Sequence, residues 1–232
     1  MSLQKTLKSM ADKEIAKHSQ RFFKTGKGEY GEGDIFLGIR VPDLRKLAKE
    51  YQSLPLAEVE RVVASKYHEQ RLVGLLILVY QFEKSKTEKE RKKIYTTYLK
   101  LFPYINNWDL VDTSCHKIIG LFLQDQDRRP LYLWAQSKNL WVRRISIIST
   151  MWFIRHGDLE DSFKIAEILL GDPEDLIHKA VGWVLRECGK KDQKRLKQFL
   201  NQHSVYMPRV MLRYSIERLP ETLRKQYLKR GR

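Results

Sequence analysis

Apolar and polar residues alternate along the chain with the period of three to four residues that is typical of amphipathic helices. No segment keeps the strict alternation of a half-buried strand, and the hairpin dipeptides Asn-Gly, Asp-Gly and Gly-Gly do not occur. The apolar run at 72–80 could be a buried strand on periodicity alone, but its helical flanks and the lack of turns beside it favour a core helix. The pattern therefore predicts an all-α fold with about a dozen helices.

Proline and glycine mark the expected helix boundaries. Prolines are tolerated in the first turn, where backbone amides have no partner within the helix. Four prolines lie near the starts of apolar-periodic segments: Pro42, Pro55, Pro130 and Pro208. Asp172 is expected to cap a helix over 174–188, and Gly189 is expected to end it.

The expected helices repeat in pairs. Leading helices over 131–137 and 161–170 are each followed, after a short turn, by a more apolar helix. The more apolar helices are expected over 69–82, 108–123, 141–154, 176–188 and 208–219. Their starts are about 30 to 40 residues apart, which is the period of HEAT and armadillo repeats. We therefore expect residues 1–232 to form a single domain, a HEAT-like helical-repeat solenoid whose second helices line a concave groove.

The charge composition indicates a nucleic-acid partner for this fold. Lys and Arg number 44 against 28 Asp and Glu, so the net charge of the 232-residue chain is +16. A basic groove would gain affinity for a nucleic acid by releasing counterions from its phosphates, whereas the plainer interpretation of these charges is a solvated surface. The residues we expect to contact DNA are Lys27, Arg40, Arg143, Lys179, Arg186, Lys190, Arg209 and Arg213.

Several classes of protein are disfavoured. Two distant cysteines, Cys115 and Cys188, predict neither a disulfide framework nor a structural zinc site, and the six histidines lack metal-ligand spacing. Residues 1–17 lack the apolar core of a secretory signal, and the longest apolar run is far shorter than the roughly 20 residues that span a bilayer. We expect a monomeric cytoplasmic protein without metal or cofactor that does not associate with membranes.

The glycine-rich segment 26–31 has the letters of a dinucleotide-binding fingerprint, but no expected strand precedes it and no helix opens from it. We therefore discard it as a cofactor site. Two interpretations stay open: a flexible connection, which is favoured, and a loop whose amides approach a phosphate.

The segment 105–112 is the most informative. In a helix that begins here, Trp108 and Asp112 share one face, while Asp109 is turned about 100° from Trp108. A carboxylate is electrostatically costly in a phosphate groove, so its presence there suggests chemistry. The alternatives are a first-turn acid that complements the helix dipole and a core tryptophan.

Two later segments repeat this theme. Arg143 and Arg144 follow Trp141, and Lys179 lies one turn before Trp183. Stacking of successive repeats would let Asp112, Arg144 and Trp183 converge. We expect three other tryptophans to be packing residues: Trp134, Trp141 and Trp152.

With these motifs the chain resembles the AlkD-type DNA alkylation repair glycosylases, which are built from HEAT-like repeats. The resemblance covers nearly the whole chain and is specific through the order of its motifs. These are RFFKTG at 21–26, GEGDIFLGIRVP at 31–42, WDLVD at 108–112, NLWVRR at 139–144 and KAVGWVLRE at 179–187.

The resemblance implies hydrolysis of the N-glycosidic bond of cationic N3- or N7-alkylated purines in duplex DNA, as a step of base excision repair. By matching position, Asp112 is similar to the catalytic carboxylate, Trp108 and Trp183 to the aromatic pair beside the lesion, and Arg144 to the site arginine. The family's early aromatic contact corresponds to one of three residues, Tyr30, Phe22 or Phe23.

The chemistry is consistent with these residues. A cationic base leaves without a general acid, and a carboxylate such as Asp112 can stabilise the oxocarbenium-like sugar and orient water. The alternative is a catalytically inactive DNA-binding repeat protein that recognises damaged or unusual DNA. A third class, an RNA-binding or protein-interaction repeat, explains the charge but not the acid between tryptophans.

Overall fold

The computed structural model describes residues 2–230, and these form helices and no strand. The extended segment before α5 contributes one isolated bridge, between Ile35 and Tyr67. The chain divides into two compact units, Met1–Ile118 and Ile119–Arg232. The prediction of an all-α helical-repeat fold is confirmed. A single domain over residues 1–232 and a basic concave groove stay predictions.

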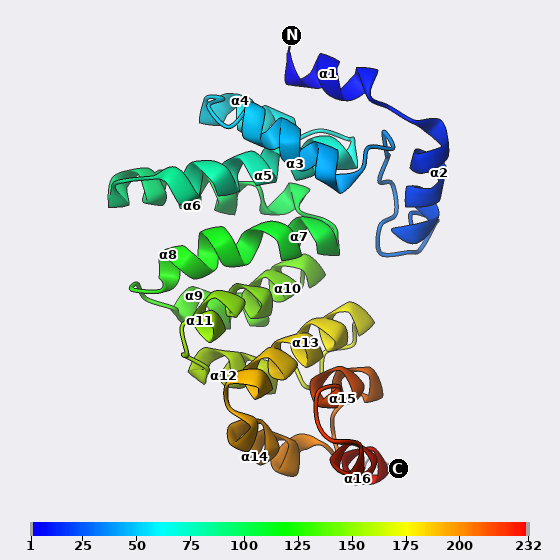
Figure 1. The fold of residues 1–232 in the computed structure, drawn as a ribbon, viewed down its shortest axis with the longest axis vertical. Helices are drawn as coiled ribbons and strands as arrows, with labels where there is room; N and C mark the ends of the chain where they lie inside the picture. Colours follow the sequence, from blue (N-terminus) through cyan, green and yellow to red (C-terminus); the bar gives the residue numbers. More distant parts are fainter. Residues whose placement is uncertain (1, 231–232) are drawn as a thin grey trace. The chain divides into compact units, whose positions relative to one another are not determined.

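The N-terminal unit is built around α5 (His68–Lys84), which is buried along most of its length. The other elements of this unit are α1 (Leu3–Ser9), α2 (Lys13–Phe22), α3 (Val41–Glu50), α4 (Leu56–Val63), α6 (Glu88–Lys100), the 3₁₀ turn Phe102–Tyr104 and α7 (Trp108–Cys115). Helices α3, α4 and α6 lie beside α5 (Figure 1). The apolar residues of 72–79 are at most 2% exposed, because α3, α4, α6 and α7 all pack on α5. The prediction that this apolar run forms a buried core helix is therefore confirmed.

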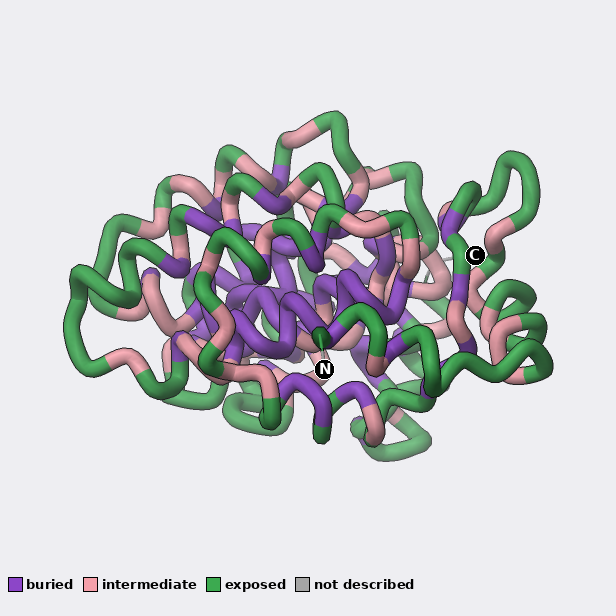
Figure 2. Tube along the Cα trace, turned by 90° about the horizontal axis from the view of Figure 1, so that it is seen from above, coloured by how far each residue is buried: buried purple, intermediate pink, exposed green. Residues whose placement is uncertain are grey.

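The C-terminal unit is organised around α13 (Asp175–Lys191), which packs on helices from both sides of the sequence. Its other elements are α8 (Leu121–Leu123), α9 (Arg129–Ala135), α10 (Leu140–Ser149), α11 (Met151–Arg155), α12 (Glu160–Ile168), α14 (Gln193–His203), α15 (Arg209–Ile216) and α16 (Glu221–Arg230). Along the trace, buried stretches alternate with exposed turns (Figure 2). This alternation is the pattern of paired amphipathic helices.

Gly182 allows a close contact between two helices of the C-terminal unit. A Cβ atom on Gly182 would lie 2.5 Å from Cβ of Tyr214 and 2.6 Å from the carbonyl oxygen of Met211. The backbones of α13 and α15 therefore approach each other at a point where only glycine fits.

The predicted proline boundaries are confirmed. Pro42 and Pro130 occupy the first turns of α3 and α9, and Pro55 and Pro208 directly precede α4 and α15.

Two predicted boundaries of α13 are wrong. The helix begins at Asp175 and its N-cap residue is Glu174, while the Asp172 carboxylate accepts hydrogen bonds from the amide of Glu174 and from Arg143. The helix also continues through Gly189 to Lys191. Gly189 serves packing, since a Cβ there would lie 2.4 Å from Cδ2 of Leu196.

The helix predicted over 108–123 is interrupted. A π-helical turn, His116–Gly120, separates α7 from α8. The single π turn within an otherwise α-helical run agrees with the usual occurrence of π-helix as short bulges.

Candidate functional site

Helix α7 begins at Trp108, where the site was expected. The Asn107 side chain accepts a hydrogen bond from the amide of Trp108 at 2.8 Å, and Asn107 itself is completely buried. Since Trp108 and Asp112 are four residues apart in one α-helix, they lie on the same face, as predicted. Both side chains are partly exposed.

The Trp108 indole belongs to an aromatic cluster with the residues that end α2. Phe23 stacks on the indole with ring centroids 5.3 Å apart and planes at 21°, and Phe22 meets it edge-on at 6.0 Å. Phe22 is 57% exposed, whereas Phe23 is half-buried. The Tyr30 hydroxyl donates a hydrogen bond to the Phe22 carbonyl at 3.5 Å. Two of the three early aromatic candidates, Phe22 and Phe23, therefore contact the Trp108 indole, and Tyr30 is bonded to the backbone of Phe22.

Behind Trp108 the aromatic stack continues into the core. Phe23 lies 5.0 Å from the rings of both Phe36 and His68, and Phe36 stacks on His68 at 4.5 Å. The stack thus joins a surface indole to a buried histidine through a single phenylalanine.

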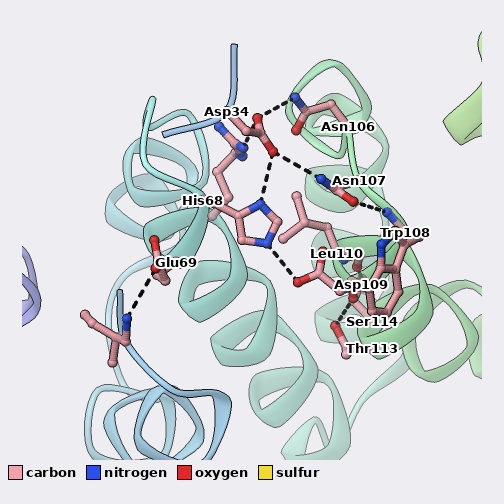
Figure 3. A network of polar contacts seen from close by, with 12 residues as sticks. Asp34, His68, Glu69, Asn106, Asn107, Trp108, Asp109, Leu110, Thr113 and Ser114 are labelled. Atoms are coloured by element: carbon pink, nitrogen blue, oxygen red, sulfur yellow. Dashed lines mark hydrogen bonds and ion pairs between the residues drawn. The ribbon is translucent and has the colours of Figure 1, made fainter. Parts of the chain in front are cut away.

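His68, the first residue of α5, links two buried carboxylates (Figure 3). Its Nδ1 lies 3.1 Å from Oδ2 of Asp34 and its Nε2 lies 2.8 Å from Oδ2 of Asp109. The histidine is 1% exposed, and the two aspartates are 5% and 7% exposed. Asp109 thus points into the core, whereas Asp112 on the same helix is partly exposed.

Asp34 is the most heavily bonded carboxylate of this network. Arg71 donates to it at 2.5 Å, Asn106 at 3.0 Å and Asn107 at 3.3 Å. Burial alone would raise the pKa of Asp34, but the hydrogen bond from His68, the charge of Arg71 and the amide of Asn106 outweigh it and lower the pKa to about 2. Asp34 is therefore ionised at neutral pH.

The same network charges the histidine. Burial alone would lower the pKa of His68, but the carboxylates of Asp109 and Asp34 outweigh it and raise the pKa to about 9. Both neighbours are acceptors only, so both ring nitrogens must donate, which is the hydrogen-bonding pattern of an imidazolium.

Asp112 lies in the electrostatic range of a second buried polar pair. The Tyr98 hydroxyl is 2.6 Å from Oγ of Ser114, and Tyr98 is completely buried. Burial raises the pKa of Tyr98 well above its usual value, and the negative charge of Asp112 adds to that shift. The negative charge of Asp112 thus acts on the buried Tyr98 hydroxyl through a region of low dielectric constant.

The other two expected site residues belong to the C-terminal unit. Arg144 on α10 is 5% exposed, and its Nη1 donates to the carbonyl of Leu176 at 2.5 Å. Trp183 is partly exposed on α13, directly after Gly182. Convergence of these two residues with Trp108 and Asp112 stays a prediction.

Most of the basic residues expected to contact DNA also have partners within the protein. Arg143 pairs with Asp172 at 2.5 Å with 11% of its side chain exposed, and Arg186 pairs with Glu217. Lys190 pairs with Glu187 and Lys179 with Asp175, each at 2.7 Å, and Arg209 donates to the Leu228 carbonyl at 3.0 Å. Three are exposed residues for which no such pair occurs within 2–230: Lys27, Arg40 and Arg213.

The glycine-rich loop binds its own carboxylates. Glu29 accepts a hydrogen bond from the amide of Gly26 at 2.9 Å, and Glu32 accepts one from the amide of Gly28 at 2.9 Å. These amides thus have acceptors within the loop, which favours the structural connection over a phosphate loop.

The sequence matches the family of DNA alkylation repair enzymes over residues 3–219. The chain belongs to this family. A solved structure described as a predicted DNA alkylation repair enzyme from Enterococcus faecalis is similar, with a TM-score of 0.73 and 18% identity over 91% of this chain and 98% of that chain. Identity at this level shows a shared fold alone. No curated protein matches the sequence.

Family membership supports a role in the repair of alkylated DNA and implies a DNA substrate. Within residues 2–230, no three His, Cys, Asp or Glu side chains are grouped so that they could hold a metal ion. No helix in this same part of the chain is long and apolar enough to cross a membrane.

Sequence reasoning missed the buried network of Asp34, His68 and Arg71. A signal was present at the start of α5, where four consecutive polar residues, 68–71, directly precede the apolar core run. All four are buried, at 1% to 5% exposure. Polar residues at the head of a buried helix require partners, so this arrangement predicts a polar network.

Proposed function

We propose that the protein is a monofunctional DNA glycosylase that excises cationic N3- or N7-alkylated purines from duplex DNA in base excision repair. The observation that supports this most directly is the α7 surface. There a partly exposed carboxylate, Asp112, lies one helical turn after a partly exposed indole, Trp108, beside an exposed phenylalanine, Phe22.

The proposed reaction needs few catalytic groups. An alkylated purine that already carries a positive charge leaves without protonation, so the main requirement is to stabilise the positive charge that develops on the sugar. Asp112 would supply that negative charge and orient the attacking water. The other α7 carboxylate, Asp109, is held in the core by His68 and has a structural role.

The aromatic cluster would hold the cationic base and sugar. Indole and phenyl faces attract cations by about 0.5 to 2 kcal/mol each. We assign the early aromatic contact to Phe22, because it is more exposed than Phe23 or Tyr30 while it touches Trp108. Phe23 would support Trp108 from behind.

The C-terminal unit would contribute Trp183 and Arg144, for which the family resemblance is the support. Trp183 is partly exposed and can offer an aromatic face. Arg144 is almost fully buried, so balancing negative charge suits it better than contact with a DNA phosphate.

Single-turnover release of 7-methylguanine from duplex DNA tests the proposal. Trp108→Ala and Phe22→Ala should slow release, whereas Tyr206→Ala, which removes an aromatic side chain that is 80% exposed, serves as the matched control. If the parental protein binds this DNA but releases no base, the glycosylase proposal is wrong and an inactive DNA-binding protein is supported.

A further inference from the structure

His68 connects three segments of the N-terminal unit that are far apart in sequence. It begins α5, its Nδ1 reaches Asp34 in the segment before α3, and its Nε2 reaches Asp109 in the first turn of α7. The backbone amide of His68 also donates to the Ile35 carbonyl at 2.9 Å. The side chain of the next residue, Glu69, accepts hydrogen bonds from the backbone amides of Leu37 and Gly38 at 2.8 and 2.7 Å.

The charges of the four mutually bonded side chains, Asp34, His68, Arg71 and Asp109, balance only when the histidine is protonated. Asp34 and Asp109 bring two negative charges, while Arg71 and the His68 imidazolium bring two positive charges. The His68 and Asp34 side chains are each 2% exposed, so an unbalanced charge would be costly.

Two routes lead from this cluster to the α7 surface. The polar route has two branches. One passes through Asp109, which is bonded to His68 and directly follows Trp108. The other passes through Asn107, which accepts a hydrogen bond from the Trp108 amide and donates one to Asp34. The aromatic route runs from the His68 ring to Phe23 and from Phe23 to Trp108, with centroids 5.0 and 5.3 Å apart. His68 thus contacts two neighbours of the indole: Asp109, which follows Trp108 in the chain, and Phe23, whose ring stacks on Trp108.

We propose that charged His68 is a positioning residue that holds the first turn of α7 and the stack of Phe23 on Trp108, and so gives the protein its preference for lesion-containing over undamaged DNA. This inference rests on the proposed function, from which it takes the α7 surface around Trp108 as the place where the lesion binds and 7-methylguanine as the lesion. The general affinity for DNA comes from surface cations and should not depend on His68.

The groups that face His68 define how this device responds to pH. Asp34 faces it from the segment before α3, Asp109 from α7 and Arg71 from α5, while Phe23 and Phe36 bring no charge. The pKa of Asp34 lies near 2 and that of His68 near 9, and an arginine stays charged. Loss of the His68 proton is therefore the first event that unbalances the cluster as pH rises from neutrality.

The test combines a variant with a spectroscopic signal from Trp108. His68→Gln keeps a polar side chain but carries no charge. His203→Gln is the matched control, because His203 also faces a carboxylate, that of Glu167 at 3.7 Å, but lies in the C-terminal unit. Subtracting the emission of Trp108→Phe from that of each protein isolates the Trp108 signal. Affinity is measured for matched duplexes with and without one 7-methylguanine.

We expect His68→Gln to reduce the affinity ratio of lesion to undamaged DNA by about 10-fold, the loss expected when one aromatic ring no longer faces the cationic base. Its affinity for undamaged DNA should stay unchanged, and His203→Gln should behave as the parent. Parental Trp108 emission should change with a midpoint near pH 9, and His68→Gln should lack this transition.

An unchanged affinity ratio in folded His68→Gln, or a Trp108 signal that is flat from pH 7 to 10 in the parental protein, would overturn the proposal. If His68→Gln does not fold, the pH dependence of Trp108 emission in the parental protein alone tests the proposal. Neither readout requires turnover, so a protein that shows both effects but releases no base contradicts only the proposed glycosylase activity.

Discussion

Asp109 and Asp112 lie three residues apart on α7 and occupy opposite environments. Asp109 is 7% exposed and its Oδ2 is 2.8 Å from Nε2 of buried His68, whereas Asp112 is partly exposed on the face that carries Trp108. One helix turn therefore holds a carboxylate that maintains the fold and a carboxylate that we place in the reaction.

Replacing Asp112 with Asn should slow base release by about 100-fold, because the amide keeps the shape but loses the negative charge that faces the developing oxocarbenium. Affinity for DNA should persist or increase, since a repulsion of the phosphates is removed. Single-turnover release of 7-methylguanine, with affinity and thermal unfolding recorded beside it, measures these effects.

Asp125→Asn is the matched control for Asp112→Asn, because Asp125 is an exposed aspartate outside the site. Asp109→Asn is unsuitable as a control, since it leaves charged His68 with one carboxylate fewer. Release at the parental rate by Asp112→Asn, or a loss that only follows unfolding, would mean that Asp112 has no catalytic role.

Asp34→Asn should lower the free energy of unfolding at pH 7 by about 2 kcal/mol, the value of a carboxyl pKa lowered from 3.8 to about 2. Because the folded pKa is depressed, this stabilisation is present above about pH 4 and is lost as pH falls through 2. Urea unfolding at pH 7 and pH 3 should show a smaller difference between parent and variant at the lower pH.

Asp43→Asn provides the comparison for Asp34→Asn. The Asp43 side chain is 40% exposed, and among residues 2–230 it pairs only with Lys46 in its own helix, so its replacement should change stability by less than about 0.5 kcal/mol. Equal destabilisation by the two variants would contradict a special role for the buried network.

DNA affinity should fall steeply with salt, because several phosphates are neutralised at once. Arg213→Ala should reduce the slope of log K against log salt concentration by about 1, as expected for the loss of one phosphate contact. Arg143→Ala should mainly reduce stability, because it leaves Asp172 without its 2.5 Å partner. Titrations at several salt concentrations and denaturant unfolding separate the two outcomes, and a flat salt dependence of the parent contradicts phosphate binding.

The reaction should leave an abasic site and an intact strand. In sequence, Lys179 is the lysine of α13 nearest to Trp183. Its amino group is engaged by Asp175 at 2.7 Å, and its side chain is 41% exposed rather than desolvated as a nucleophilic lysine would be. Borohydride treatment during turnover should trap no covalent adduct. A trapped complex that disappears in Lys179→Arg would show that the mechanism includes a Schiff base.

Sequence periodicity was sufficient for the core of each unit, since the buried α5 and α13 follow directly from their apolar residues. Sequence periodicity gave wrong helix boundaries where a residue type that often ends or caps helices instead makes a tertiary contact. Gly189 resembles a helix terminator, but its missing side chain makes room for Leu196, and Asp172 resembles a cap, but its carboxylate is engaged by Arg143.

The same limit applies to the site. Trp108 and Asp112 could be predicted together because helical spacing alone places them on one face. The contacts among Asp34, His68 and Asp109 span 34 and 41 residues of sequence, and no local pattern encodes which polar residues meet over such distances. Burial of the polar head of α5 predicts that partners exist, but not which residues they are.

The close contact at Gly182 limits how this protein can change. A larger residue at 182 would meet the Met211 carbonyl as well as the Tyr214 side chain, so a smaller residue at 214 could not compensate for it. The helix that carries Trp183 is therefore locked in its rotation by a position that admits no side chain. The adjacent pair Gly182 and Trp183 can thus serve as a sequence marker for chains that keep this tryptophan in the same orientation.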